Sequence, residues 1–335
     1  MPKEITHWVL AERVAEKLPP GFAQSTIRKH FHLYLLGSVA LDTPFYTLVG
    51  RYTETFTTLA ERLHSRWGED SFEPVRDVLE HYGNQVSDAA WAFLFGLLTH
   101  IMADAVHHPV VMYYSGCPHD MPPGLKTSSL CRHRILEGYL DLYHLKQRPH
   151  AAKWTFLSLL RRKEIGSVDF YRLMSVLYFG RPGVYFPHVR MAFASHALFH
   201  RIFQKRHLFP LIRHGNRVMG GKWWHVEALF NPNGKKEIAR GLYSAPIPYR
   251  HPVTGRRDEK TMEQLARRSV ASSLSLILQV ERGLEAGDVA DYFASVRGPS
   301  PENGLVGVPT REMAYHDLET NLSEIMGVEP RLCDE

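Results

Sequence analysis

The chain of 335 residues has little of what marks secreted or membrane-spanning proteins. Three cysteines, Cys117, Cys131 and Cys333, are too few for a disulfide framework and favour a reducing compartment. The N-terminal sequence MPKEITHWVLAERVAEKLPP has no long apolar core, so we expect an amphipathic helix there and no removable leader. Asp104 interrupts the longest apolar run before it reaches the ~18–20 residues of a membrane span. The expected location is therefore cytoplasmic.

The sequence also has no strong excess of charge of one sign and no strand periodicity. Its net charge of +5 is too small to identify an anionic partner. No segment alternates apolar and polar residues over the length of a strand, whereas apolar residues at helical spacing are common. This pattern predicts an all-α protein, a multi-helix bundle.

The helical spacing predicts eleven helices and two parts of the chain. The helices are expected near residues 2–18, 25–37, 48–66, 71–83, 87–106, 128–146, 151–162, 167–178, 189–204, 258–284 and 311–326. Turn-forming residues predict loops at 180–189, 220–257 and 296–309. We expect a helical domain at 1–205 and, at 206–335, a mostly helical C-terminal extension that packs on it.

Histidine is the residue type in excess. The chain has twenty histidines, and twelve lie in the first 150 residues. Within the apolar helix expected at 87–106, His100 and Asp104 are four residues apart and therefore share one face. Ionisable side chains are costly to bury unless they are paired or bind a metal. His107 and His108 continue this stripe, but Pro109 is expected to end the helix, so spacing does not choose between them.

A second expected helix repeats this arrangement. His133, Glu137 and Asp141 follow one another at intervals of four residues, and Asp42 comes shortly after a glycine-containing helix end. His7 and His64 lie on two further expected helices. Imidazole and carboxylate ligands without thiolates are typical of zinc sites. The sequence therefore predicts a metal centre inside the helical domain.

These residues resemble the zinc-dependent phospholipase C family, whose all-helical fold is shared with the zinc-dependent single-strand nucleases. The resemblance covers about residues 4–200, and its most specific parts are HIMADAVHHP at 100–109 and HRILE at 133–137. It implies one zinc bound by Asp42, His64, His100 and Asp104, and a second bound by His108, His133 and Glu137. It implies a third zinc at His7 that Asp104 bridges. His81 is an alternative to His64, and His107 is an alternative to His108.

The resemblance also implies an activity, which makes the domain at 1–205 the expected metal-binding catalytic domain. In secreted members of the family the third zinc is completed by an N-terminal tryptophan, whereas here Trp8 follows His7, so we expect two zinc ions or two with a weakly held third. Two such ions clamp a phosphodiester and activate water. Asp42 is the best candidate to orient that water or take its proton. The expected substrate is a phospholipid, cleaved at its headgroup, with peripheral membrane contact.

Three alternatives stay open from the sequence. The same scaffold serves a single-strand nuclease or nucleotidase, because ligand spacing does not depend on what the phosphorus carries. Glu4-x-x-His7 and Glu61-x-x-His64 have the spacing of a di-iron carboxylate site. The third alternative is a non-catalytic, metal-stabilised module, which would be marked by a closed coordination shell.

A further histidine pair, His196 and His200, has no carboxylate at helical spacing and is interpreted as a core feature.

Overall fold

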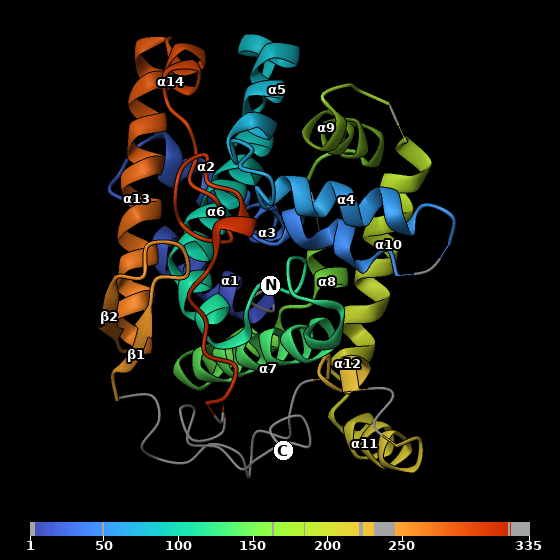
Figure 1. The fold of residues 1–335 in the computed structure, drawn as a ribbon. Coiled ribbons are helices and arrows are strands. Elements are labelled where there is room, and N and C mark those ends of the chain that lie inside the picture. The colour runs from blue at the N-terminus through green and yellow to red at the C-terminus, as the bar shows by residue number, and fades with distance from the viewer. Residues whose placement is uncertain are drawn as a thin grey trace.

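The computed structural model describes residues 4–48, 50–162, 164–183, 185–220, 224–230, 245–320 and 322. These residues form fourteen α-helices, five short 3-10 helices and a single two-stranded sheet. The prediction of an all-α bundle is confirmed. Figure 1 shows the helices gathered around the central α6, with α13 running beside it.

The helices before residue 205 make up most of the bundle. They are α1 (Glu4–Lys17), α2 (Phe22–Lys29), α3 (Phe31–Gly37), α4 (Thr53–Leu63), α5 (Glu73–Tyr82), α6 (Asp88–Ser115), α7 (Pro123–Gln147), α8 (Phe156–Arg161), α9 (Ser167–Phe179) and α10 (Phe186–Phe203). The 3-10 helices among them are η1 (Ala40–Tyr46), η2 (Gly83–Gln85) and η3 (Pro149–Lys153). The loop expected at 180–189 is shorter than predicted, because α10 already begins at Phe186.

The elements after residue 205 are more varied. They are η4 (Arg206–Leu208), α11 (Phe209–Val218), α12 (Trp224–Glu227), β1 (Ile247–Arg250), β2 (Arg257–Lys260), α13 (Met262–Ala286), α14 (Val289–Ser295) and η5 (Thr310–Glu312). The strands β1 and β2 pair antiparallel, with Ile247 opposite Lys260. This hairpin was not predicted, because strands of four residues are too short to show a periodicity.

Helix α6 is the centre of the core. Helices α3, α13, α7 and α1 all pack against it. Among the described residues it is the one helix long and apolar enough to cross a bilayer, but 89% of its most apolar window is buried inside the protein. Its apolar character is thus accounted for by packing in the core of the bundle. The cytoplasmic location stays a prediction.

Two glycines allow α3 and α6 to touch backbone to backbone. A Cβ atom added at Gly37 would lie 2.1 Å from the Phe93 carbonyl oxygen, and one at Gly96 would lie 2.0 Å from that of Tyr34. No side chain fits at these distances, so the helices meet only because both positions are glycine. The contact brings the end of α3, and Asp42 in η1 after it, close to the His100 turn of α6.

The single helix expected at 25–37 is wrong: α2 and α3 are separate helices that meet at His30. Helix α2 also begins earlier, and its cap is not Ser25. Its N-terminal turn is satisfied by Glu281 of α13, whose carboxylate accepts a 2.7 Å hydrogen bond from the Ala23 amide. A carboxylate from elsewhere in the chain thus serves the helix N-terminus, which local sequence cannot reveal.

Pro109 does not end α6, contrary to the sequence prediction, since the helix continues to Ser115. Proline lacks an N–H group, so the carbonyl of Ala105, four residues earlier, loses its helical donor. Gly304 packs closely against this carbonyl. The helix therefore tolerates the proline at a site where another segment of the chain covers the exposed backbone.

Two predictions near the C-terminus are also wrong. Helix α13 does not end at Gly283 but runs to Ala286, with Gly287 in the left-handed conformation as its cap. The helix expected at 311–326 is absent from residues 313–320. Backbone N–H groups there bond to distant partners, since Ala314 and Tyr315 both donate to the Pro252 carbonyl. Residues 321 and 323–326 lie outside the described residues.

The division of the chain at 205/206 stays a prediction. Helix α13, from the expected extension, packs against α1 and α6 of the expected catalytic domain. Arg13 of α1 forms a bidentate ion pair with Glu263 of α13, with N–O distances of 2.8 and 3.1 Å. Of the loop expected at 220–257, residues 221–223 and 231–244 lie outside the described residues.

Candidate metal centre

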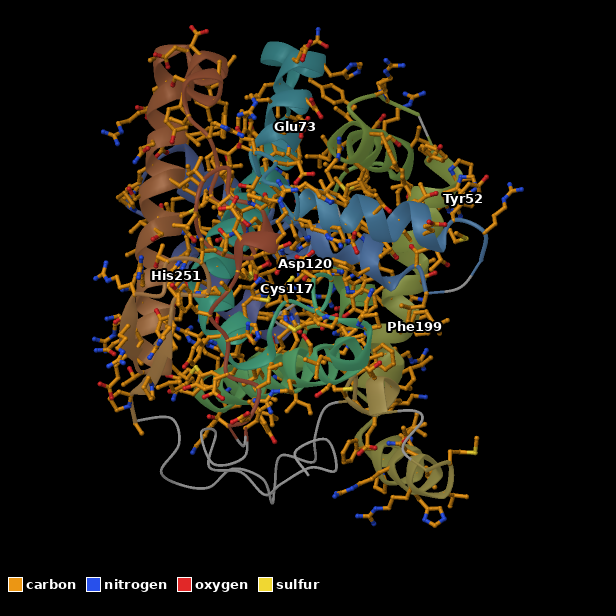
Figure 2. The ribbon with its side chains drawn as sticks, in the orientation of Figure 1. Tyr52, Glu73, Cys117, Asp120, Phe199 and His251 are labelled. Atoms are coloured by element: carbon orange, nitrogen blue, oxygen red, sulfur yellow. The ribbon has the colours of Figure 1, made fainter. Side chains whose placement is uncertain are left out.

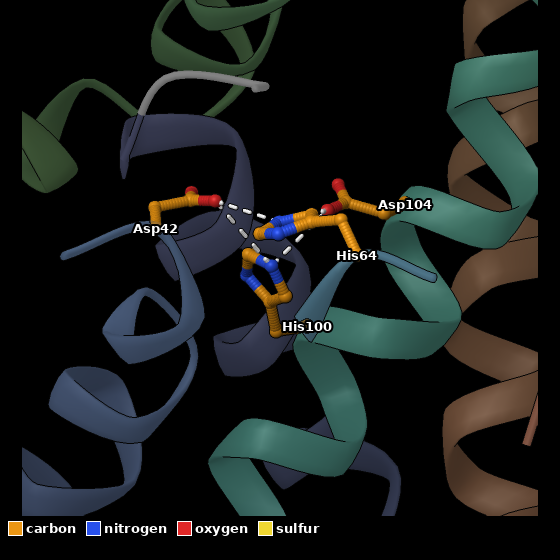
Figure 3. Close-up of side chains that lie close together, drawn as sticks. All are labelled: Asp42, His64, His100 and Asp104. Atoms are coloured by element: carbon orange, nitrogen blue, oxygen red, sulfur yellow. Dashed lines mark hydrogen bonds and ion pairs between the residues drawn. The ribbon is translucent and has the colours of Figure 1, made fainter. Parts of the chain in front are cut away.

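Four of the predicted residues form a first cluster, and they come from three elements. Asp42 lies on η1, His64 follows α4, and His100 and Asp104 are one turn apart on α6 (Figure 3). One ligand atom from each lies within 4.8 Å of the others. His64 Nε2 is 3.1 Å from Asp42 Oδ1, and His100 Nε2 is 3.1 Å from Asp104 Oδ2. All four side chains are buried.

A second cluster contains His108, His133 and Glu137, whose ligand atoms also lie within 4.8 Å of one another. His108 comes from α6, and the other two from α7. His133 Nε2 is 2.8 Å from Glu137 Oε1, and His108 Nε2 is 3.6 Å from the same oxygen. The two helices thus bring two nitrogens and one carboxylate together.

Asp104 connects the two clusters. Its Oδ2 atom faces the first cluster, whereas its Oδ1 atom lies 3.8 Å from His108 Nε2 and 3.4 Å from His7 Nε2. The His7 ring stacks on that of His100, with ring centroids 4.2 Å apart. His7 therefore lies where the resemblance placed a third ion, on the second oxygen of Asp104. Trp8 is turned away and donates to the Leu35 carbonyl.

Three of these imidazoles are hydrogen-bonded to backbone carbonyls through Nδ1, the outer nitrogen, which faces away from the clusters. The Nδ1 atom of His100 is 2.9 Å from the Ser38 oxygen, that of His64 is 2.8 Å from the Ala60 oxygen, and that of His108 is 2.9 Å from the Pro301 oxygen. In the neutral ring, donation from Nδ1 fixes the tautomer and leaves Nε2 with a lone pair for a metal. All three Nε2 atoms point into the clusters, as ligands would.

The fit of these residues to a metal can be tested by their hydrogen bonds. Within the described part of the chain, His100 Nε2, His108 Nε2, both ring nitrogens of His7 and both oxygens of Asp104 are buried and make no hydrogen bond, although Asp104 lies within ion-pair distance of His100 and His7. Buried polar atoms are ordinarily hydrogen-bonded, and imidazoles alone satisfy a buried carboxylate only when they are protonated. Cations would satisfy these atoms together, so the donor set fits zinc.

The structure places the two rival histidines elsewhere. His81 is exposed on α5 and packs edge-on against Tyr82. His107 is buried, but its Nδ1 atom lies 2.9 Å from the Ala103 carbonyl and 3.1 Å from Ser269 Oγ of α13. Neither belongs to a cluster. Asp141, which continues the α7 stripe, accepts hydrogen bonds from the Thr6 amide and hydroxyl.

The glutamates of the di-iron alternative do not join either cluster among the described residues. Glu61 pairs with Arg66 and with His119, whose Nδ1 atom is 2.9 Å away. Glu4 accepts a 2.7 Å hydrogen bond from Tyr46 and lies 3.0 Å from His196 Nε2. The interpretation of His196 as a core residue agrees with its complete burial. Glu4 and Glu61 therefore pair with other side chains, and their spacing from His7 and His64 does not mark a di-iron site.

Burial and mutual charge set the protonation of the centre. Burial lowers the pKa of His7 and of His108 to about 4, so both are neutral at pH 7. Burial acts the same way on His100, but Asp104 and Asp42 outweigh it and raise the pKa of His100 to about 9. The pKa of His64 is raised too, since Asp42 outweighs its burial. Without metal, His100 carries a proton at neutral pH.

Zinc binding is therefore expected to release about one proton per molecule from His100 at pH 7, and His64 adds to the release. Because a zinc ligand must be deprotonated, each unit of pH below about 9 should weaken binding roughly tenfold through His100 alone. Calorimetric titration in buffers of different ionisation enthalpy measures the release. Binding without any proton release at pH 7 would contradict this assignment.

A cavity of about 270 Å³ lies beside the second cluster. His133 and Glu137 form part of its wall together with Arg134, and much of the rest is apolar, including Phe45, Met112 and Phe203. The second cluster therefore borders an open space through His133 and Glu137, which a closed structural metal site would not provide.

The sequence did not point to every residue of this wall. Glu302, from the loop after α14, reaches the cavity and lies 194 positions from His108. His119 lies there too, in the loop between α6 and α7. Glu302 has no partner at helical spacing, so no local signal marks it, whereas His119 could bind metal in principle but was expected to have a structural role in its loop.

Comparison with known proteins gives one match. The model of a family described as zinc dependent phospholipase C matches residues 6–182, more than half of the chain. The matched part holds all residues of both clusters and ends before α10. No curated protein and no solved structure matches the chain.

Proposed function

The chain belongs to the zinc-dependent phospholipase C family, and from that premise we propose that it is a zinc-dependent hydrolase that cleaves the headgroup phosphodiester of a phospholipid. The observation that carries the proposal is the convergence of buried imidazoles and carboxylates in two clusters that share Asp104, the second of which borders the cavity through His133 and Glu137. Zinc when bound would supply Lewis-acid activation of the phosphodiester and of a water molecule.

The residues of the chain have separate parts in this proposal. Asp42, His64, His100 and Asp104 would hold one ion, and His108, His133 and Glu137 a second. His7 would hold a third, weaker one, because the described residues offer it only Asp104 as a close carboxylate partner besides the more distant Asp42. Asp42 would orient the attacking water or take its proton.

The cavity wall favours a lipid over the nucleic-acid alternative. Its lining is largely apolar, which suits the acyl-bearing part of a phospholipid better than a polyanionic chain of nucleotides. Arg134 also lines the cavity, and its guanidinium is suited to a phosphate. Peripheral contact with a membrane would deliver such a substrate and stays part of the proposal.

The test compares turnover on phosphatidylcholine with turnover on single-stranded DNA in the zinc-loaded protein. We expect release of the phosphorylated headgroup and no cleavage of DNA. His100→Ala should lose both zinc from the first cluster and activity, whereas His81→Ala, a change at the exposed rival histidine, should retain both. Cleavage of DNA alone would favour the nuclease alternative, and full zinc content in His100→Ala would contradict the ligand assignment.

A further inference from the structure

The loop at 298–310, which follows α14, lies against the metal centre at His108. It is held at both ends on the segment after α4, where Gly298 donates to Asp70 at 2.7 Å and the Thr310 amide donates to the Arg66 carbonyl at 2.9 Å. The Thr310 hydroxyl donates to Asp120, which Figure 2 labels near the middle of the molecule. The loop thus has a defined position against the helical core.

Internal hydrogen bonds and one close contact fix the shape of this loop. The Gly304 amide donates to the Ser300 carbonyl, and the Ser300 amide donates to that of Leu305, both at 2.8 Å. Gly304 has a φ of +75°, and a Cβ atom there would lie 2.5 Å from the Ala105 carbonyl oxygen. Only glycine permits this approach, which brings the loop down onto α6 beside His108.

Two consecutive loop residues then meet His108. The Pro301 carbonyl accepts the hydrogen bond from His108 Nδ1, and Glu302 Oε2 lies 3.7 Å from the same nitrogen. Glu302 is only 7% exposed, and its Oε2 atom has no hydrogen-bond partner in the described part of the chain. The side chain also lines the cavity together with His133 and Glu137. A carboxylate with a purely structural role would be paired at this depth.

We propose that Glu302 is a positioning residue of the metal centre, whose carboxylate acts through His108 on the second zinc. Negative charge beside the outer nitrogen of a zinc-bound imidazole makes the ring a stronger ligand and balances the charge of the ion. The inference rests on the proposed function, since it assumes zinc at the second cluster. It also gives residues beyond the family match a part in the site.

The test measures zinc binding by the full-length protein in competition with a chelator. In Glu302→Gln the first zinc should bind as in the unchanged protein, and the second should bind about 10- to 100-fold more weakly. Glu302→Asp, which keeps the charge, should recover part of the loss. The matched control is Glu312→Gln, a change at an exposed glutamate ten positions further along the chain, and it should bind both ions normally.

Melting temperature separates this role from a structural one. Without metal, Glu302→Gln should melt no lower than the unchanged protein, because it removes a buried negative charge whose Oε2 atom makes no hydrogen bond among the described residues. Its rise in melting temperature on adding zinc should be smaller. Equal zinc affinity in Glu302→Gln and the unchanged protein would overturn the inference, whether or not the variant is less stable. An unchanged protein that binds no zinc would instead overturn the proposed function.

Discussion

Asp104→Asn is expected to lower turnover about 10²- to 10³-fold and to weaken zinc binding at both clusters. Asp104 faces both clusters: its Oδ2 atom lies 3.1 Å from His100 Nε2, and its Oδ1 atom lies 3.8 Å from His108 Nε2. Neighbouring imidazoles outweigh its burial and hold the pKa of Asp104 well below its usual range, so it stays ionised. Asparagine keeps the shape of the side chain but removes the charge that two cations would share.

Zinc content by elemental analysis and turnover on phosphatidylcholine together measure this effect. Asp88→Asn is the matched control, because Asp88 is an exposed carboxylate at the start of the same helix, where it forms an ion pair with exposed Lys29. It should keep zinc and activity, since exposed ion pairs contribute little. If Asp104→Asn bound both ions as tightly as the unchanged protein, Asp104 would not be a shared ligand.

The second large effect is expected at the contact between α3 and α6. Gly96→Ala should lower the free energy of unfolding by about 3 kcal/mol, because its Cβ atom would meet the Tyr34 carbonyl oxygen at 2.0 Å and force the helices apart. The change should also weaken zinc binding. Ser38, at the end of α3, holds His100 by its carbonyl, and that hydrogen bond stretches when α3 moves.

Denaturant unfolding of the metal-free protein gives the free energy, and Gly124→Ala gives the comparison. Gly124 lies in the first turn of α7 with nothing within 4 Å of an added Cβ atom. Alanine there should leave stability unchanged or raise it by up to about 1 kcal/mol, because it is the better helix former. If alanine lowers the free energy of unfolding at Gly96 but raises it at Gly124, the loss at Gly96 comes from close packing and not from helix propensity. Equal changes in the free energy of unfolding at the two positions would show that the close contact between α3 and α6 does not contribute to stability.

Part of the centre was predictable because its ligands are local pairs. His100 with Asp104, and His133 with Glu137, are four residues apart, and an α-helix brings such pairs together whatever the rest of the chain does. The apolar run of α6 also predicted that its pair would be buried. These predictions needed only helix geometry and the cost of burying charge.

The choice between His107 and His108 could not be made in this way. Both lie about one turn after Asp104. Because Pro109 was expected to end the helix, helical geometry could not be used to choose between them. In the structure the helix continues, and the neighbours decide: α7 and Pro301 meet His108, whereas Ser269 of α13 meets His107. The same holds for His64 and His81, because only the packing of α4 brings His64 to Asp42.

Most of the helices, and the paired imidazoles and carboxylates within them, could be predicted from the sequence, since both follow from interactions over a few residues. Which pairs meet around a shared Asp104, and that Glu302 of a distant loop joins them, depends on how the helices pack. The physical reason is that contacts between segments depend on backbone approaches such as Gly96 on Tyr34 and Gly304 on Ala105. Such approaches leave no periodic signal in the chain.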